Sequence, residues 1–294
     1  MALESKVVQF ADKARLEAEP AGVLPFTCRI CFGHLLLAGQ YQLLSERENN
    51  MSTSQYTPTK TLSSVTKEGL MRASTASLHT ILFKRGLRNT YIQGVSKINK
   101  GPVKMVGQAF TLRYIPARED IDTVAAFRDP EHPQRVAVET VPEGMVLVSD
   151  CRQDASAASA GSILLNRLDY RNCAGFVSDA GIRDSEDAAT MTMPVFCAKP
   201  SAPTNLTKHH GVDIQVPIGC GGVAVFPGDV LVGDNDGIIV IPQELADEVA
   251  EEAVKMEAFE DYVLEKVRSG TPVIGLYPPN EDAQAEYRRY MESR

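Results

Sequence analysis

The chain has 294 residues, of which 44% are hydrophobic and 23% charged, an ordinary balance for a globular protein that buries a sizeable core. Its formal charge of −8 argues against a nucleic-acid binder, because such binding depends on clustered lysine and arginine. The sequence has no run of about 18 apolar residues and no polybasic block, so neither a membrane span nor a membrane-surface segment is expected.

The first fifty residues differ in character from the rest of the chain. Acidic residues occur early in this segment, whereas a secretory signal begins with a basic region before an apolar core. A second, start-like stretch begins at Met51. We predict that residues 1–50 are a poorly ordered extension, that Met51 is a candidate native start, and that one domain spans residues 51–294.

The six cysteines show no framework spacing, which is typical of free thiols in a reducing compartment. We therefore expect a cytoplasmic protein. Cys28 and Cys31 form a lone CxxC with His34 nearby, which supplies too few ligands for a tetrahedral zinc site, so we interpret the pair as incidental.

The middle of the chain predicts alternating helices and strands. A helical period begins near Val65, with Leu70, Leu78 and Leu82 on one face, and Ser74 falls on the same face. Residues 103–114 predict a strand and turn, residues 116–144 a loop with a short helix, and residues 145–150 a core strand.

The second half predicts a βαβ-like unit followed by more strands and a long helix. Ser162 is a candidate cap for a helix over residues 162–168, and residues 174–178 predict the next buried strand, ending in a turn at a glycine. Further strands are expected at residues 194–197, 222–226 and 238–241, with Gly228-Asp229 and Gly233-Asp234 as turns between the last two. An amphipathic helix is predicted over residues 243–268 and a polar tail from residue 277, so the pattern indicates a mixed α/β fold.

Two segments could carry chemistry. A glycine that opens a helix, here Gly161 before Ser162, leaves backbone N–H groups free to bind an anion, although the same pattern also describes an ordinary capped helix. Arg183 and Asp184 follow a predicted core strand. Arginine offers a planar fork for a carboxylate, and aspartate offers a hard oxygen ligand for Mg²⁺ or Mn²⁺, whereas the alternative is a surface ion pair of little energetic value.

Other polar segments carry weaker signals. His209-His210 lies in a polar stretch without a third ligand, and we interpret it as a solvated loop pair. The sequence has no Gly-x-Ser-x-Gly elbow, no dinucleotide fingerprint that opens a helix, and no P-loop. A charged cluster in the segment RYIPARED could face a pocket but is interpreted as a solvated loop; it comprises Arg113, Arg118, Glu119 and Asp120.

The combination of these motifs resembles the RraA-like family, which includes the 4-hydroxy-4-methyl-2-oxoglutarate aldolases. The residues that carry the resemblance are Gly161-Ser162-Ile163-Leu164, Arg183-Asp184 and, in the right order around them, residues 106–111, 146–150, 227–229 and 233–237. The resemblance spans about residues 65–265 and implies a β/β/α sandwich of the swivelling-domain type, a mixed sheet with flanking helices. It also implies a homotrimer or a dimer of trimers.

The resemblance implies roles for specific residues. Gly161, Ser162, Ile163 and Leu164 would hold the carboxylate of a small 2-keto acid, Arg183 would bind its oxygens as a catalytic residue, and Asp184 would hold a divalent Mg²⁺ or Mn²⁺. Two positions differ from the family's aldolases, which have aspartate where this chain has Ser162 and glycine where it has Ala180. The resemblance therefore implies substrate binding more directly than it implies aldol cleavage.

The expected activity is that of a metal-dependent carbon–carbon lyase, which cleaves a 4-hydroxy-2-oxo acid or decarboxylates oxaloacetate through a pyruvate enolate. A Schiff-base aldolase would need a buried lysine, and the nearest candidate, Lys199, has nothing around it in the sequence to lower its pKa. The alternative is a non-catalytic regulator, since the family is named for a protein that inhibits an RNA-processing endonuclease. A methyltransferase, a label also attached to such sequences, would show a glycine-rich loop after its first strand, and none is present.

Overall fold

The computed structural model describes residues 60–101 and 104–293, all of which belong to the unit Ser54–Arg294. The predicted extension over residues 1–50, the candidate start at Met51 and the Cys28–Cys31 pair lie outside the described residues. The four cysteines within the described part are free and buried.

The long strand β2 (Met105–Pro116) organises a nine-stranded mixed sheet. It pairs in parallel with β3 (Val146–Asp150), and antiparallel with β10 (Val230–Asp234) along its first half and with β7 (His209–Ile214) along its second half. The pairing with β7 contains a register shift between Arg113 and Tyr114, which is typical of a β-bulge. The remaining strands of this sheet are β1 (Ser96–Lys97), β4 (Ala158–Ala160), β5 (Gly175–Ile182), β6 (Val195–Pro200) and β11 (Gly237–Ile241).

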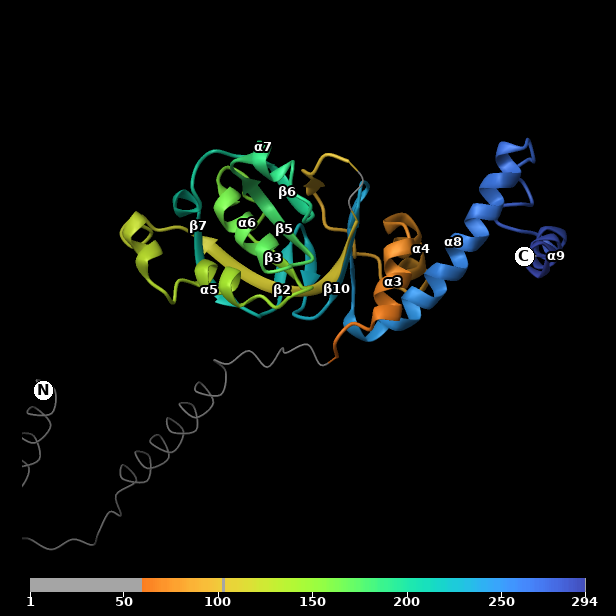
Figure 1. Cartoon of the computed structure of the whole chain (residues 1–294), viewed down its shortest axis with the longest axis horizontal. Helices are drawn as coiled ribbons and strands as arrows, with labels where there is room; N and C mark the ends of the chain where they lie inside the picture. The colour runs from red at the N-terminus through yellow and green to blue at the C-terminus, as the bar shows by residue number, and fades with distance from the viewer. Residues whose placement is uncertain (1–59, 102–103, 294) are drawn as a thin grey trace, which may run out of the picture. The chain divides into compact units, whose positions relative to one another are not determined.

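The sheet has a hydrophobic core on each of its two faces, and successive side chains of β3 point alternately into one core and the other. Leu147 packs on the face covered by α5 (Pro133–Thr140) and α6 (Ser162–Tyr170). Its neighbours Val146 and Val148 point to the opposite face, toward the hairpin of β8 (Ile218–Cys220) and β9 (Val223–Val225). The order hairpin, sheet, helices confirms the predicted β/β/α sandwich, and Figure 1 shows α5 and α6 beside β2, β3 and β5.

Helices α3 (Ser64–Arg72) and α4 (Thr75–Lys84) replace the single helical segment suggested by the period that begins near Val65. The break comes at Ala73, whose backbone is extended, and Ser74 then caps α4 by accepting a hydrogen bond from the Ser77 N–H. The prediction that Ser74 belongs to an apolar helix face is therefore wrong. Both helices and the first half of α8 (Ala246–Arg268) cover β10 and β11 (Figure 1).

The polar tail contains a helix that the sequence pattern did not indicate, α9 (Glu281–Glu292). Its start is fixed by Asn280, whose side chain accepts a hydrogen bond from the Ala283 N–H at 2.9 Å. α9 packs against the second half of α8 through aromatic residues, with the ring centroids of Tyr262 and Tyr287 5.2 Å apart. Short helices elsewhere in the described residues are η1 (Val124–Arg128), α7 (Ser185–Ala188), η2 (Asn205–Thr207) and η3 (Gln243–Leu245).

Most later strands form where the sequence predicted them, with two corrections. Gly233-Asp234 is not a turn: it ends β10 and pairs with the start of β11, so the turn lies at residues 235–236. The histidine pair is not a solvated loop, because it begins β7 and His209 is fully buried.

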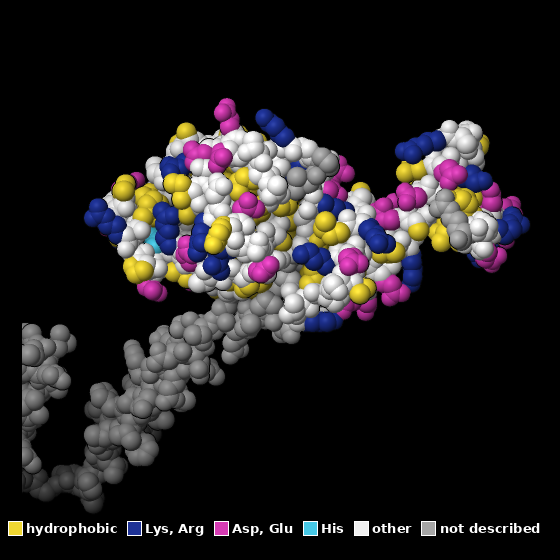
Figure 2. Space-filling model, viewed as in Figure 1, with side chains coloured by type: hydrophobic (Ala, Val, Ile, Leu, Met, Phe, Trp, Pro, Cys, Tyr) yellow, Lys and Arg dark blue, Asp and Glu magenta, His cyan; other side chains and the backbone are white. Residues whose placement is uncertain are grey.

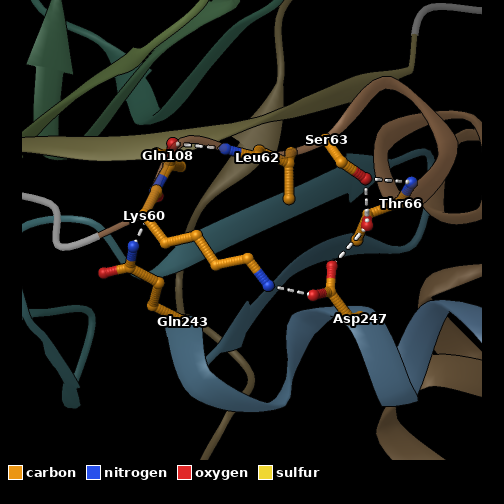
Figure 3. A network of polar contacts seen from close by, with 7 residues as sticks. All are labelled: Lys60, Leu62, Ser63, Thr66, Gln108, Gln243 and Asp247. Atoms are coloured by element: carbon orange, nitrogen blue, oxygen red, sulfur yellow. Dashed lines mark hydrogen bonds and ion pairs between the residues drawn. The ribbon is translucent and has the colours of Figure 1, made fainter.

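A polar network fixes the beginning of the described chain against β2 and α8 (Figure 3). The Leu62 N–H donates to Gln108 Oε1 at 3.0 Å, and the Thr66 hydroxyl donates to Asp247 Oδ1 at 2.5 Å. Lys60 forms an ion pair with the other oxygen of Asp247. Residues 60–66 are therefore held by side chains from two distant parts of the sequence.

The surface of the described residues mixes charges of both signs. On the face shown in Figure 2, basic and acidic side chains alternate over the fold and form no continuous basic track. Within the described part of the chain, no helix has the length and apolar character required to span a membrane.

Candidate functional site

The site is built at the end of β5, a strand whose eight residues are all buried. The strand does not turn at Gly181, as the sequence suggested, but continues to Ile182. Gly181 is required for close packing, because a Cβ there would lie 2.4 Å from the Cβ of Ser201. The chain turns instead at Asp184, which adopts the left-handed conformation with φ 55° and ψ 40°. Such a conformation is uncommon outside glycine and persists only where the surroundings hold it.

The N-terminus of α6 faces this turn. Its cap is Gly161, and Ser162 is the first helical residue, so the prediction that Ser162 caps the helix is wrong. Ser162 nevertheless contributes: its N–H donates to Asp184 Oδ2 at 3.1 Å, and its hydroxyl lies 3.3 Å from the same oxygen. Asp184 thus satisfies one of the N–H groups that a helix start leaves free, and its negative charge suits the positive end of the helix dipole.

Gly161 brings the predicted site residues together. A Cβ on Gly161 would lie 2.8 Å from Arg183 Cγ and 2.8 Å from Asp184 Oδ2, which is closer than real Cβ contacts. Only glycine permits this approach of the helix start to both side chains. Arg183 Nε and Asp184 Oδ2 are 3.8 Å apart, and each side chain is 47% exposed. An ion pair this open contributes at most about 1 kcal/mol, so the pair alone does not explain the arrangement.

A cavity of about 130 Å³ lies at this corner. Of the six residues predicted for the site, Gly161, Ile163, Leu164, Arg183 and Asp184 line it, and Ser162 does not. The other lining residues come from segments that no sequence motif connects: Phe127, Gln134, Arg135, Ala158, Ser159, Ala160, Thr204 and Asn205.

The charged cluster of the segment RYIPARED does not line this cavity. Arg113 pairs with Asp213 at 3.6 Å, and Arg118 pairs with Asp120 at 2.6 Å, with all four side chains largely exposed. The cluster is exposed, as predicted, but Arg113 lies in β2 and not in a loop, so the prediction of a loop is wrong for that residue.

Beneath the site, Asp179 in β5 ties three segments together. It is 2% exposed, and its carboxylate accepts hydrogen bonds from the backbone N–H groups of Cys151 at 2.6 Å, Gln153 at 3.0 Å and Gly221 at 3.1 Å. Burial raises the pKa of Asp179, and these hydrogen bonds oppose the rise. Burial also raises the pKa of the Cys151 thiol well above its usual value, so this thiol is held in its unreactive, protonated form.

The two histidines of β7 differ in burial: His209 is fully buried, whereas the side chain of His210 is 30% exposed. His209 packs edge-on against Tyr114, with ring centroids 5.9 Å apart, and burial lowers its pKa, which favours the neutral ring. His210 Nδ1 lies 2.7 Å from Asp122 Oδ1. Neither histidine lines the cavity.

The donor set at the corner is suited to a hydrated hard cation. Among the described residues, no three His, Cys, Asp or Glu side chains cluster as metal ligands. Asp184 keeps one oxygen, Oδ1, without a hydrogen-bond partner in the described part of the chain, while Oδ2 is oriented by Ser162. A single oriented carboxylate fits Mg²⁺, which retains several waters, and does not fit a tetrahedral zinc site.

Lys199 does not fit a Schiff-base role. It lies near the end of β6, is exposed to solvent and does not line the cavity. A Schiff-base lysine needs desolvation to become a nucleophile at neutral pH, and this position provides none.

Comparison with known proteins gives the family. The sequence model of the RraA-like family, described as Aldolase/RraA, matches residues 75–240, more than half of the chain. The chain belongs to the RraA-like family. A relative from Halalkalibacterium halodurans named "Putative 4-hydroxy-4-methyl-2-oxoglutarate aldolase" is 39% identical over 116 residues, which are 39% of this chain and 54% of that protein. Protein DlpA of Legionella pneumophila is 25% identical over 202 residues, 69% of this chain and 31% of DlpA. This RraA-like chain thus aligns with about half or less of the length of these curated relatives.

Solved structures share the fold of this RraA-like chain. The Streptomyces coelicolor protein RraAS2, described as an unusual member of the RNase ES inhibitor RraA protein family, superposes with a TM-score of 0.61 at 28% identity. The match covers 70% of this chain and 98% of RraAS2. An uncharacterized Pseudomonas syringae protein superposes with a TM-score of 0.63 at 25% identity, covering 73% of this chain and 97% of that one.

Proposed function

We propose that this chain is a divalent-metal-dependent lyase that acts on small 2-keto acids and works as a homotrimer or a pair of trimers. The observation that carries the proposal is the contact of Gly161 with both Arg183 and Asp184 at the edge of a small cavity. A helix N-terminus, the guanidinium of Arg183 and a carboxylate with a free oxygen meet there, and the family includes relatives named as putative aldolases.

Substrate binding would use the helix start and Arg183. The carboxylate of a 2-keto acid would lie against the first turn of α6 at Ile163 and Leu164, where the dipole favours an anion. The planar guanidinium of Arg183 would then reach the carboxylate or the adjacent keto oxygen. Arg183 directly follows β5, so the strand fixes its backbone position beside the start of α6.

Cleavage of the bond between C3 and C4 of such an acid leaves its electron pair as the enolate of pyruvate. Negative charge develops on the keto oxygen, and Arg183 would place positive charge beside it before the reaction begins. A hard divalent cation at Asp184, when bound, would act as a Lewis acid on the same oxygens. Asp184 would hold that cation through Oδ1, since Oδ2 is engaged by Ser162.

Of the two reactions, the cavity suits oxaloacetate decarboxylation more directly. Decarboxylation releases CO2 and needs no base, whereas retro-aldol cleavage needs a base to take the proton of the C4 hydroxyl. Among the described residues, Asp184 is the only carboxylate that lines the cavity, and no histidine, cysteine or lysine lines it. Ser162, which stands where the aldolases of the family have aspartate, cannot supply a carboxylate.

A regulatory role is the second candidate, and the likeness to RraAS2 favours it. A regulator would act through a surface rather than through the cavity. Replacement of Arg183 would then leave inhibition of an RNA-processing endonuclease unchanged, whereas a lyase would lose turnover.

The proposal is tested by measuring pyruvate formation from oxaloacetate and from 4-hydroxy-4-methyl-2-oxoglutarate with Mg²⁺ or Mn²⁺. We expect turnover of oxaloacetate to exceed that of the hydroxy acid, to stop in EDTA and to return when metal is added. Full activity in EDTA, or no turnover of either acid, contradicts the proposal. Light scattering at micromolar concentration checks the assembly, which a monomer would contradict.

A further inference from the structure

The cavity has a second cationic group that the proposed reaction does not use. Arg135, in the first turn of α5, lines the cavity together with Arg183 and Asp184. Two arginines against one aspartate leave the lining positive even before any metal is added. A positive cavity of about 130 Å³ suits a small ligand that carries more than one negative charge.

Arg135 is oriented but not neutralised. Its Cζ lies 4.5 Å from the centroid of the Phe127 ring, and the same ring packs edge-on against His132 at 5.3 Å. Stacking over an aromatic face holds a guanidinium by its plane and leaves the N–H groups at its edge available. Within the described residues, the guanidinium of Arg135 forms no ion pair and no hydrogen bond, in contrast to Arg167 nearby, which is paired with Glu139 at 2.7 Å.

Asn205 supplies a second, independent observation. It is 5% exposed, it lines the same cavity, and its Nδ2 has no hydrogen-bond partner within the described part of the chain. A buried amide donor without a partner is costly, so such groups usually await water or a ligand. A carboxylate would accept from the guanidinium edge and from this amide at once.

We propose that Arg135, stacked on Phe127 and assisted by Asn205, binds the distal carboxylate of the substrate and makes the enzyme selective for dicarboxylic 2-keto acids. The inference rests on the proposed function for its substrate class, since the 2-keto acid end is the part assigned to Arg183. Arg135 is in this account a specificity-determining residue, whereas Arg183 acts on the reacting end.

The binding experiment uses stable ligands that differ only in the distal carboxylate. Calorimetry with Mg²⁺ compares malate with lactate, and 2-oxoglutarate with 2-oxobutyrate, in the wild type and in Arg135→Gln. We expect the wild type to prefer each dicarboxylate by about tenfold to a hundredfold, and Arg135→Gln to lose that preference while keeping its affinity for lactate and 2-oxobutyrate. Arg135→Lys should fall between the two, because it keeps the charge but not the planar fork.

Arg167→Gln is the matched control, since it removes one positive charge from neighbouring α6 at a side chain that does not line the cavity. It should retain the preference. The inference is overturned if Arg135→Gln keeps the preference, if Arg167→Gln loses it equally, or if the wild type shows none.

A turnover experiment separates this inference from the proposed function. If the wild type turns over oxaloacetate and 4-hydroxy-2-oxopentanoate, Arg135→Gln should raise KM for oxaloacetate about tenfold or more and leave KM for the monocarboxylate unchanged. If the wild type turns over neither acid but shows the Arg135-dependent preference in calorimetry, the proposed function fails and the dicarboxylate subsite stands. Turnover without any Arg135-dependent selectivity supports the lyase and overturns the subsite.

Discussion

Two aspartates of one short stretch, Asp179 and Asp184, show how the same side chain acquires opposite uses. Asp179 lies within β5 and is 2% exposed, whereas the side chain of Asp184, just beyond the strand, is 47% exposed. Asp179 points into the fold because the strand continues through it, and Asp184 faces the cavity because the chain turns there.

The partners of the two carboxylates differ accordingly. Both oxygens of Asp179 accept backbone N–H groups, three in all, and because the residue is 2% exposed neither oxygen is open to a ligand. Asp184 is engaged through Oδ2 by Ser162 and retains Oδ1. The comparison shows that a polar residue beside a strand is a candidate for chemistry only when its hydrogen-bonding capacity is not already used by the fold.

The substitution Asp179→Ala tests the structural role of Asp179, and we expect it to have the largest effect. Three buried N–H groups would lose their acceptor, so we expect the free energy of unfolding to fall by about 3–5 kcal/mol. Urea denaturation measures it, with Asp187→Ala, an exposed aspartate, as the control expected to change stability by about 0.5 kcal/mol. A loss below about 1 kcal/mol would show that Asp179 does not hold its three segments together.

The substitution Arg183→Ala tests whether the residues that follow β5 take part in the reaction. The charge of Arg183 matters most as the enolate forms, so we expect kcat to fall about 10²–10³-fold, as for a lost oxyanion donor. Stability should change by no more than about 1 kcal/mol, because the ion pair with Asp184 is open to solvent. Unaltered turnover would show that Arg183 and Asp184 form only a surface ion pair, and it would contradict the lyase assignment.

Asp184→Asn is expected to weaken metal binding rather than the chemical step. Asparagine tolerates the left-handed backbone that Asp184 adopts, so the fold should be kept while the anionic ligand is lost. We expect Mn²⁺ affinity to drop about tenfold or more and excess Mn²⁺ to restore part of the rate. Calorimetric titration of Mn²⁺ provides the measurement, and an affinity equal to that of the wild type would contradict the role.

Much of the fold could be predicted from the sequence because its signals are local. The short apolar runs at residues 145–150, 174–178 and 238–241 become strands β3, β5 and β11, and the apolar period after residue 243 becomes α8. The helical period near Val65 suggested one helix where the structure has two, because Ser74, which caps the second helix, falls at the spacing of the apolar residues. The burial of His209 could not be predicted for another reason. A strand on a sheet face buries every second residue, and a histidine among polar neighbours does not indicate which residues of the strand are the buried ones.

The candidate site could be predicted only in part. Gly161, Arg183 and Asp184 form recognisable motifs, and the structure brings them together. Arg135 and Asn205 line the same cavity from α5 and η2, and no local pattern links them to β5. Contacts between segments distant in the sequence depend on how the layers pack, which a single sequence does not specify.

Asp229 is a third aspartate, and its burial makes the stability of the protein depend on pH. It is 8% exposed, its oxygens accept only the N–H groups of Phe226 at 2.9 Å and Gln243 at 3.3 Å within the described residues, and burial raises its pKa to about 6. Because the folded state then binds a proton more tightly than the unfolded state, the contribution of Asp229 to stability increases as pH falls through 6 toward the ordinary aspartate pKa. One pH unit below 6, this gain is about 1.4 kcal/mol relative to pH 7.5.

Asp229→Asn removes this titration, so the measured quantity is the difference in free energy of unfolding between wild type and variant at pH 7.5 and pH 5. Taking the difference cancels His132 and His209, whose lowered pKa values make the protein less stable as pH falls below 6.5. We expect the wild type to gain on the variant by about 1.4 kcal/mol over this range. If this difference in free energy of unfolding is the same at pH 7.5 and pH 5, the pKa of Asp229 is not raised by folding. The hydrogen bonds to Asp229 would then fully offset the cost of burying its charge.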